Sequence, residues 1–145
     1  EEHSEKIPIN FASSGQQEVL WLLNQLYILM LKKEKAFVII EEPEAHLHPR
    51  GQRKIGELVA LAAANGVQIF METHSDHVLN GIRLSVRNKK ILSDKVKINY
   101  FYEYLSEEGI QKHEKTSPEI FEDGSLSNWP EGFFDEWDKA IDELF

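Results

Sequence analysis

The first ninety residues carry long and short apolar runs in alternation. The longest run spans residues 19–31 and is followed by Lys32 and Lys33. It exceeds the length of an ordinary strand, and Ser13 and Ser14 ahead of it are good N-cap residues. The lysines suit the negative end of a helix dipole. The pattern therefore predicts a mostly buried helix that begins near the two serines.

Two shorter apolar runs predict strands. Residues 36–40 (AFVII) form a continuous apolar stretch, which indicates a strand buried on both faces, as in a parallel sheet. Residues 67–71 (VQIFM) form the second buried strand. Between the two strands, Pro49 suits the first turn of a helix that Asn65 and Gly66 would close.

The helix between the strands carries an apolar stripe that we expect to face the core. Its members are Ile55, Leu58, Val59 and Ala62. After the second strand, Ser75 or Asp76 can cap a third helix that extends to about Val86. Helices and strands therefore alternate, which is the pattern of a parallel α/β sheet with crossover helices.

The character of the chain changes after Lys95. Residues 96–104 alternate between apolar and polar side chains and are rich in aromatics, and residues 110–115 return after a turn at residues 107–109. This pattern predicts an antiparallel hairpin. A further short strand or turn is expected at residues 119–126, where Asp-Gly is a turn signal.

The tail FFDEWDKAIDELF predicts an amphipathic closing helix. Its large apolar side chains, at helical spacing, are Phe133, Phe134, Trp137, Ile141 and Leu144. Because large aromatics at such spacing usually belong to a core, we expect this helix to cover the sheet rather than to bind a partner. The predicted fold class is α/β: a parallel sheet with crossover helices, an antiparallel hairpin and a closing helix.

Composition and charge limit the functional classes. The apolar share of 41% is sufficient for a core, and the net charge of −9 disfavours unaided nucleic-acid binding, since phosphate contacts need clustered Lys and Arg. The sequence has no cysteine, which excludes disulfides and thiolate metal sites and fits a cytoplasmic location. No apolar stretch reaches the length of a membrane span, so we expect no membrane partner.

Two adjacent carboxylates, Glu41 and Glu42, end the first predicted strand. The carboxyl ends of the strands form the ligand crevice in open α/β sheets. Adjacent residues of a strand point to opposite sides, so one carboxylate can approach a metal ion while the other faces a reacting water. Such a pair can also merely solvate a strand end, so the flanking sequence has to decide between the two interpretations.

The flanking sequence resembles ABC-type ATPases of the RecF-like, SMC-like and OLD-like branch. VIIEEPEAHLHP looks like their Walker B strand and the loop after it, ASSGQQ resembles the signature motif, and METHSDHVL resembles the switch-histidine loop. The tail from NWPEGFF onward resembles a C-terminal element of bacterial ATPases of this branch. The resemblance implies that residues 1–145 are the C-terminal part of a single P-loop NTPase domain. Residues 1–95 would hold the three motifs, and residues 96–145 the hairpin and closing helix.

The resemblance also implies a role for each matching residue. Glu42 and His74 are the predicted catalytic residues, one orienting the attacking water and the other contacting the γ-phosphate of ATP, and Glu41 is the predicted Mg²⁺ ligand. A helix N-terminus suits an anion, so the signature helix would close the nucleotide site of a second head. The residues expected to make that contact are Ser13, Ser14, Gly15 and Gln16.

The implied partners are a second ATPase head and, through other regions, DNA or a nuclease, in a prokaryotic DNA-associated or phage-defence system. Three departures from the family pattern bear on this. Glu41 stands where Asp is usual, Ser14 stands where Gly is common, and AHLHP follows the carboxylates, which favours the RecF-like branch over transporters. The sequence contains no GxxxxGK[ST] motif. We therefore expect the phosphate-binding loop in a preceding segment, and this chain alone to be inactive.

Two other functions stay open at this stage. A metal-dependent hydrolase would use a cluster of metal-ligand residue types. The cluster comprises Glu41, Glu42, Glu44, His46, His48, His74, Asp76 and His77. A non-catalytic dimerisation module with the ATPase fold would need none of them as catalysts.

Overall fold

The chain divides into two compact units, Glu1–Ile82 and Arg83–Phe145, each described by itself below. The computed structural model describes residues 14–32, 36–106 and 108–144. Within this part of the chain, no helix is long and apolar enough to cross a membrane.

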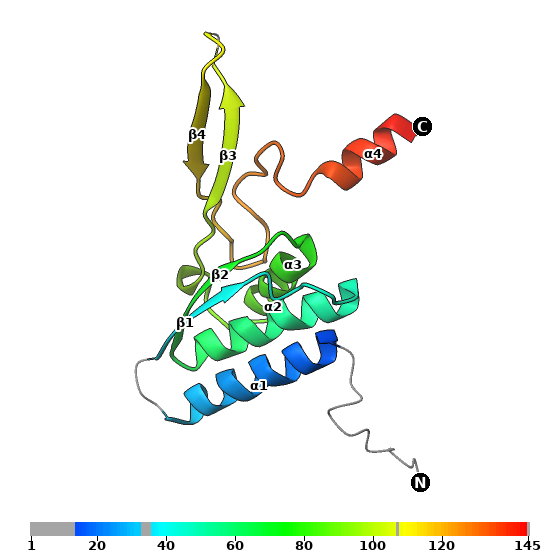
Figure 1. Cartoon of the computed structure of the whole chain (residues 1–145). Helices are drawn as coiled ribbons and strands as arrows, with labels where there is room; N and C mark the ends of the chain where they lie inside the picture. Colours follow the sequence, from blue (N-terminus) through cyan, green and yellow to red (C-terminus); the bar gives the residue numbers. More distant parts are fainter. Residues whose placement is uncertain (1–13, 33–35, 107, 145) are drawn as a thin grey trace. The chain divides into compact units, whose positions relative to one another are not determined.

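Helices and strands alternate along the first unit, as predicted (Figure 1). The elements are α1 (Ser14–Lys32), β1 (Ala36–Glu41), α2 (Pro49–Ala64), β2 (Val67–Glu72) and the start of α3 (Asp76–Arg87). β1 and β2 pair in parallel, from Ala36 opposite Val67 to Glu41 opposite Glu72. The predicted parallel α/β arrangement is therefore confirmed for these two strands.

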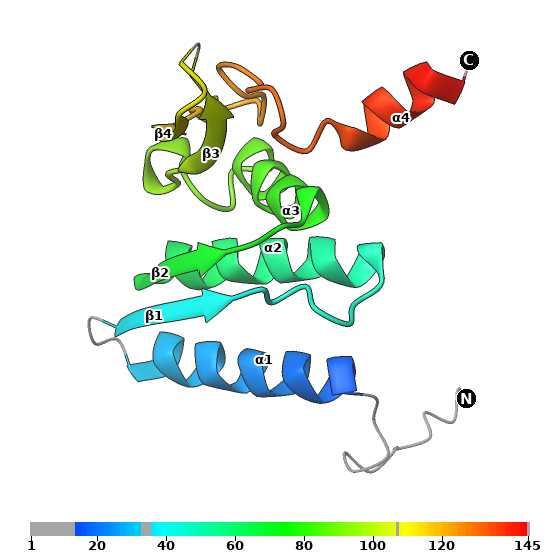
Figure 2. The same cartoon turned by 45° about the horizontal axis from the view of Figure 1, so that its top comes forward.

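The core of the first unit lies between the helices α1 and α2 and one face of the strand pair (Figure 2). Its buried members are Leu22, Leu26, Ile40, Ile55, Val59, Ala62 and Val67. This confirms the predicted stripe of α2, with Leu58 partly buried beside it. Both helices run opposite to the strands (Figure 1), so the helix starts and the carboxyl ends of the strands meet at one edge.

The opposite face of the strand pair is open among the described residues. Phe37 is 59% exposed and Ile39 is 65% exposed, and Phe37 packs against Phe70 with ring centroids 5.1 Å apart. The prediction that residues 36–40 are buried on both faces is therefore wrong for the described chain. The reason is that α1 and α2 both pack on the face of Val38 and Ile40.

The first helix is likewise buried along one stripe only. Leu22 and Leu26 lie in the core, but Trp21 is 64% exposed and Leu31 is 62% exposed. The expected mostly buried helix is thus half right, because its sequence is apolar around more of its circumference than the strands can cover.

Two glycines let the backbones of α2 and α3 meet. A Cβ atom on Gly56 would lie 2.1 Å from the carbonyl oxygen of Val78, and one on Gly81 would lie 2.2 Å from that of Arg53. Any side chain at either position would push the two helices apart. The start of α3, and the loop before it, are therefore fixed on α2.

The second unit contains the predicted hairpin. β3 (Tyr100–Leu105) pairs antiparallel with β4 (Gln111–Thr116). The expectation that the first strand begins at residue 96 is wrong. Residues 96–99 follow a 3₁₀ turn (Ser93–Lys95), and the ladder stops at the pair of Tyr100 and Thr116. Pro118, two residues after Thr116, has no N–H to donate to a longer ladder.

One face of the hairpin carries a polar cluster. The hydroxyls of Tyr102 and Tyr104 donate to the two carboxylate oxygens of Glu114 at 2.9 and 2.8 Å. These bonds raise the pKa of both phenols and lower the pKa of the Glu114 carboxyl, with the Tyr104 bond as the larger cause for Glu114. The cluster therefore ties three neighbouring side chains on the hairpin surface.

The end of the chain differs in detail from its prediction. Residues 119–126 form a turn closed by a single bridge between Ile120 and Leu126. The closing helix α4 spans Glu136–Leu144, and the two aromatics expected at its start precede it. Phe133, 4% exposed, packs edge-on against Tyr100, whereas Leu144 of α4 is 75% exposed. Phe133 therefore packs on the hairpin and not within α4, and Gly132 and Phe134 both turn the chain through positive φ before the helix begins.

Candidate functional site

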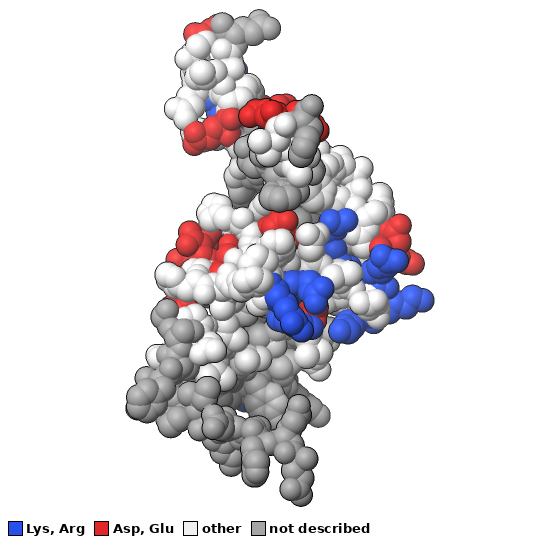
Figure 3. Space-filling view, turned by 90° about the vertical axis from the view of Figure 1, so that its right-hand side faces the viewer, with Lys and Arg blue, Asp and Glu red and all other residues white. Residues whose placement is uncertain are grey.

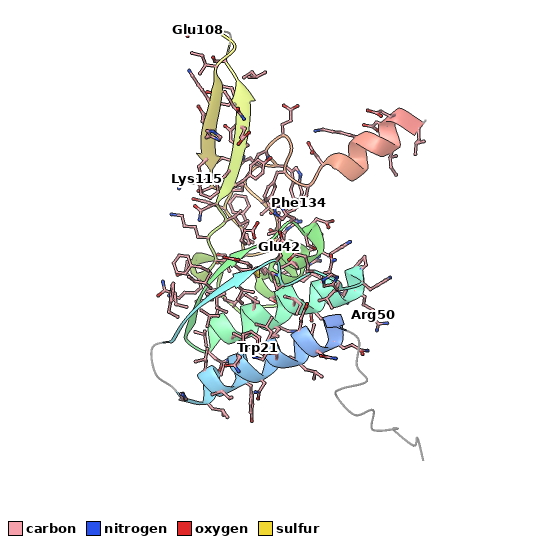
Figure 4. The ribbon with its side chains drawn as sticks, in the orientation of Figure 1. Trp21, Glu42, Arg50, Glu108, Lys115 and Phe134 are labelled. Atoms are coloured by element: carbon pink, nitrogen blue, oxygen red, sulfur yellow. The ribbon has the colours of Figure 1, made fainter. Side chains whose placement is uncertain are left out.

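The two parallel strands end in acidic residues that lie side by side. Glu41 is opposite Glu72 in the register, and Glu42 and His74 follow at the same edge, as Figure 4 shows for Glu42. His74 Nε2 lies 3.8 Å from Glu42 Oε1 and 2.9 Å from Glu72 Oε1. The structure thus brings together the two residues that the sequence nominates as catalytic.

A hollow of about 500 Å³ opens at this edge. Its lining residues are Glu18, Glu41, Glu42, Ala45 and Glu72. Four of these five are carboxylates and none is Lys or Arg, so their mutual repulsion is relieved when a cation enters. Oxygen ligands of this kind suit Mg²⁺, and the donor set therefore fits the metal that the sequence assigns to Glu41.

The sequence reasoning missed two of the hollow's residues as site residues. Glu72 directly precedes the His74 loop, and its place opposite Glu41 follows from the parallel register. Glu18 comes from α1, one turn after its start at Ser14. Both could have been found by asking which side chains share an edge with the strand ends.

The loop after β1 has an unusual backbone. Glu42 has φ of 42° and His46 has φ of 63°, the left-handed region that non-glycine residues seldom occupy. The Glu42 amide donates to the Glu72 carbonyl at 3.1 Å, and Ala45 N donates back to the Glu42 carbonyl at 3.0 Å. The turn that places the Glu42 carboxylate is thus strained but hydrogen-bonded, as residues held for function often are.

The loop after β2 is fastened to the loop after β1. The backbone amide of His74 donates to Glu44 Oε1 at 2.6 Å, and Glu44 is only 9% exposed. The Ser75 hydroxyl donates to Gln52 Oε1 at 2.7 Å, and Gln52 Nε2 donates to the Leu47 carbonyl at 2.9 Å. Ser75 also caps α3, since its Oγ accepts from Val78 N at 3.1 Å, which confirms one of the two predicted caps.

The structure describes three of the four predicted signature residues. Ser13 lies outside the described residues, Ser14 begins α1, and Gln16 is exposed. Gly15 is buried, and a Cβ atom there would lie 2.8 Å from the carbonyl oxygen of His46. Gly15 therefore lets the start of α1 rest on the β1–α2 loop of the same chain.

The histidines and carboxylates that lie close together in the sequence, and that a metal-dependent hydrolase would use, do not form one cluster in the structure. His48 Nδ1 accepts from Arg50 N at 3.3 Å and caps α2, while His77 Nδ1 lies 3.7 Å from Asp76 Oδ1. Within the described residues, one group of three offers ligand atoms within 4.8 Å of one another. Its members are Glu42, Glu72 and His74.

Two basic side chains of α2 are partly neutralised by a glutamate of the same helix. Glu57 pairs with Lys54 at 2.7 Å and with Arg53 at 3.5 Å. Figure 3 draws one face of the chain with Lys and Arg in blue and Asp and Glu in red, and both kinds of side chain gather there in local groups.

Comparison with known proteins gives the family. Residues 1–80 match the family described as "AAA domain, putative AbiEii toxin, Type IV TA system". The chain belongs to this AAA-domain family. The rest of the AAA-family chain, at residues 91–144, matches a second family, described as "Protein of unknown function (DUF3696)".

The AAA-family chain is also similar to the Old nuclease of Escherichia phage P2. The two are 25% identical over 103 residues, which is 67% of this chain and 16% of the phage protein. The chain thus spans about a sixth of that relative's length. No solved structure matches the chain. The comparisons agree with the predicted ATPase kinship at the level of an AAA-type, OLD-like domain.

Proposed function

We propose that this chain is the C-terminal half of an ABC-type ATPase head, which binds and hydrolyses ATP with Mg²⁺ between two heads. Residues 1–145 would belong to one P-loop NTPase domain, with the phosphate-binding loop supplied by a segment outside the chain. The AAA family membership and the similarity to an OLD nuclease support this assignment.

One observation carries the proposal. The carboxylate of Glu42 and the imidazole of His74 lie 3.8 Å apart, beside a hollow lined by four carboxylates at the carboxyl ends of parallel strands. This edge is where open α/β sheets bind their ligands. A single triphosphate with its cation can therefore reach both side chains.

The residues of the chain would divide the chemistry among them. Glu41 would offer an oxygen ligand or a water-mediated contact to Mg²⁺, which would neutralise phosphate charge when bound. Glu42 orients the attacking water and accepts its proton. His74 donates a hydrogen bond to the terminal phosphate, since a neutral imidazole still has one N–H. The segment Ser13, Ser14, Gly15 and Gln16 would present the start of α1 to the nucleotide of the second head.

The partners are proposed from the same relatives. Two heads would close around the nucleotide and separate after hydrolysis, and the motion would act on DNA or on a nuclease carried by other regions. The family description names a putative toxin of a type IV toxin–antitoxin system, and the relative is a nuclease of a phage. Both support our proposal that this chain acts in a prokaryotic DNA-associated or phage-defence system.

The test is Glu42→Gln in the complete protein. Loss of a positioned general base should lower the ATP turnover number by about 10²- to 10⁴-fold while the affinity for Mg-ATP is retained. The matched control is Glu103→Gln, which alters another exposed carboxylate close to a histidine, in the hairpin. Turnover that survives Glu42→Gln unchanged would remove the assignment.

A metal-dependent hydrolase is the second candidate, and the grouping of Glu42, Glu72 and His74 favours it. Three such ligands with open positions resemble sites that activate water. Metal analysis of the purified protein separates the two functions. One zinc or manganese ion retained per chain without nucleotide, together with Mn²⁺-dependent hydrolysis in the absence of ATP, would favour the hydrolase.

A further inference from the structure

We infer that Glu44 is a positioning residue, which holds His74 beside Glu42 through a buried hydrogen bond between the two strand-end loops. The inference rests on the proposed ATPase function. Neither the motif pattern nor the family match assigns this role to Glu44.

The contact is short and sheltered. Glu44 Oε1 accepts the backbone N–H of His74 at 2.6 Å across 30 positions of sequence, and the glutamate is 9% exposed. A bond between an N–H and a charged carboxylate is stronger than a neutral one, and shielding from water strengthens it further. The bond therefore sets where the His74 backbone sits relative to the loop that carries Glu42.

Fold stability alone does not explain a glutamate at this position. Its second oxygen, Oε2, is buried and has no hydrogen-bond partner among the described residues. An unpartnered polar atom in the interior lowers stability, and an apolar side chain of the same length would avoid that penalty. An apolar residue could not accept the hydrogen bond that Glu44 Oε1 accepts from the His74 amide.

The other described contacts of the His74 loop do not hold the His74 backbone to the loop that carries Glu42. Gln52 of α2 holds Ser75, the residue after the histidine, and Glu72 of β2 lies beside the His74 ring at 2.9 Å. Among these described contacts, Glu44 alone comes from the turn that begins at Glu42, two residues before it. Loss of Glu44 should therefore let the distance between Glu42 and His74 vary while both side chains remain present.

The experiment compares Glu44→Met with Glu44→Gln in the complete protein. Methionine keeps the length and removes the acceptor, whereas glutamine keeps a carbonyl oxygen that can accept the His74 amide. The matched control is Glu57→Met, which removes a partly exposed glutamate of α2 whose carboxylate pairs with Lys54 and Arg53 of the same helix. Hydrogen exchange at the His74 amide, ATP turnover, ATP affinity and the melting temperature are measured for each.

Glu44→Met should accelerate exchange at the His74 amide by about tenfold or more, since a lost bond to a charged acceptor changes an equilibrium by that factor. ATP turnover should fall by about 100-fold, as expected for a misplaced catalytic group, with ATP affinity changed less than about threefold. The melting temperature should change little, because the lost hydrogen bond lowers stability while removal of the unpartnered Oε2 raises it. Glu44→Gln should keep both the exchange rate of the His74 amide and the ATP turnover close to those of the unchanged protein.

Two results would overturn the inference. One is normal His74 exchange and normal turnover in Glu44→Met. The other is a loss of turnover that follows the melting temperature and that Glu57→Met reproduces. Should the complete protein with Glu44 intact hydrolyse no ATP, the proposed function fails, and exchange at the His74 amide still decides the role of Glu44. If Glu44→Met does not fold, the exchange rate in Glu44→Gln decides, and a rate as fast as in a random coil would contradict the inference.

Discussion

The chain contains two histidine–glutamate pairs that look alike when each is taken alone. His74 Nε2 lies 2.9 Å from Glu72, and His113 Nδ1 lies 3.1 Å from Glu103. The side chains are comparably exposed, 75% and 54% in the first pair and 71% and 57% in the second. Distance and exposure therefore do not distinguish a candidate site from a surface contact.

The surroundings separate the two pairs. Glu103 and His113 face one another across the middle of an antiparallel hairpin, where such pairs stabilise strands. His74 lies instead at the end of parallel strands, next to a second carboxylate, with its amide held by a buried side chain. The comparison teaches that a site is recognised by what fixes and surrounds its residues, and each prediction below tests this contrast.

The largest effect is expected from the histidines. His74→Ala in the complete protein should lower ATP turnover by about 10²-fold, the loss typical of one hydrogen-bond donor to a developing charge. His113→Ala should leave turnover within about twofold, because its partner lies in the hairpin. Steady-state kinetics on both variants measures the contrast, and equal losses would erase the distinction between the pairs.

An intermediate effect is expected from the packing that anchors the His74 loop. Gly56→Ala should lower the free energy of unfolding by about 1–3 kcal/mol, because its Cβ would overlap the Val78 carbonyl. Gly51→Ala in the same helix meets only Leu47 side-chain atoms, at 3.6 Å or more, and should stabilise by up to about 1 kcal/mol. Urea unfolding of the two variants measures the difference, and similar values would show that the helices are not in close contact at Gly56.

The smallest effect is expected in the hairpin and depends on pH. The pKa of Glu114 is lowered in the folded chain, so its stabilising contribution is present above the usual glutamate range and is lost as the pH falls through that lowered value. The phenols of Tyr102 and Tyr104 have raised pKa values, so their contribution is lost as the pH rises through those values. The effect should be small because the cluster is exposed.

Tyrosine ring resonances recorded across the pH range measure this loss, with Glu114→Gln as the control. Glutamine removes the carboxyl titration and should flatten the acid side of the profile. An acid-side change that persists in Glu114→Gln would assign the pH dependence to another group.

The sequence predicted the order of helices and strands well because caps and apolar periods are local signals. Ser75 and Pro49 mark helix starts by chemistry that acts within a few residues. The open face of β1 could not be predicted, since an apolar run does not tell which side of Phe37 and Ile39 a helix will cover. The late start of the hairpin could not be predicted from residues 96–99 alone, since a ladder also depends on the other strand, which ends at Thr116, two residues before Pro118.

The candidate site was predicted in part. Glu42 and His74 were nominated by motif and position, and the structure places them together. Glu44 was noticed only as one of many metal-ligand types, because its hydrogen bond to His74 spans 30 positions and leaves no local pattern. Glu72 follows from the strand register, which exists only once two strands have paired.

The left-handed backbone at Glu42 has a consequence for protein engineering. Glycine or asparagine adopts a φ of 42° with less strain than glutamate does. A library selected for heat resistance alone would thus drift toward those residues at position 42 and discard the carboxylate. At position 42, the residues that would give the highest stability lack the carboxylate that the proposed reaction needs, which is a trade-off between stability and activity.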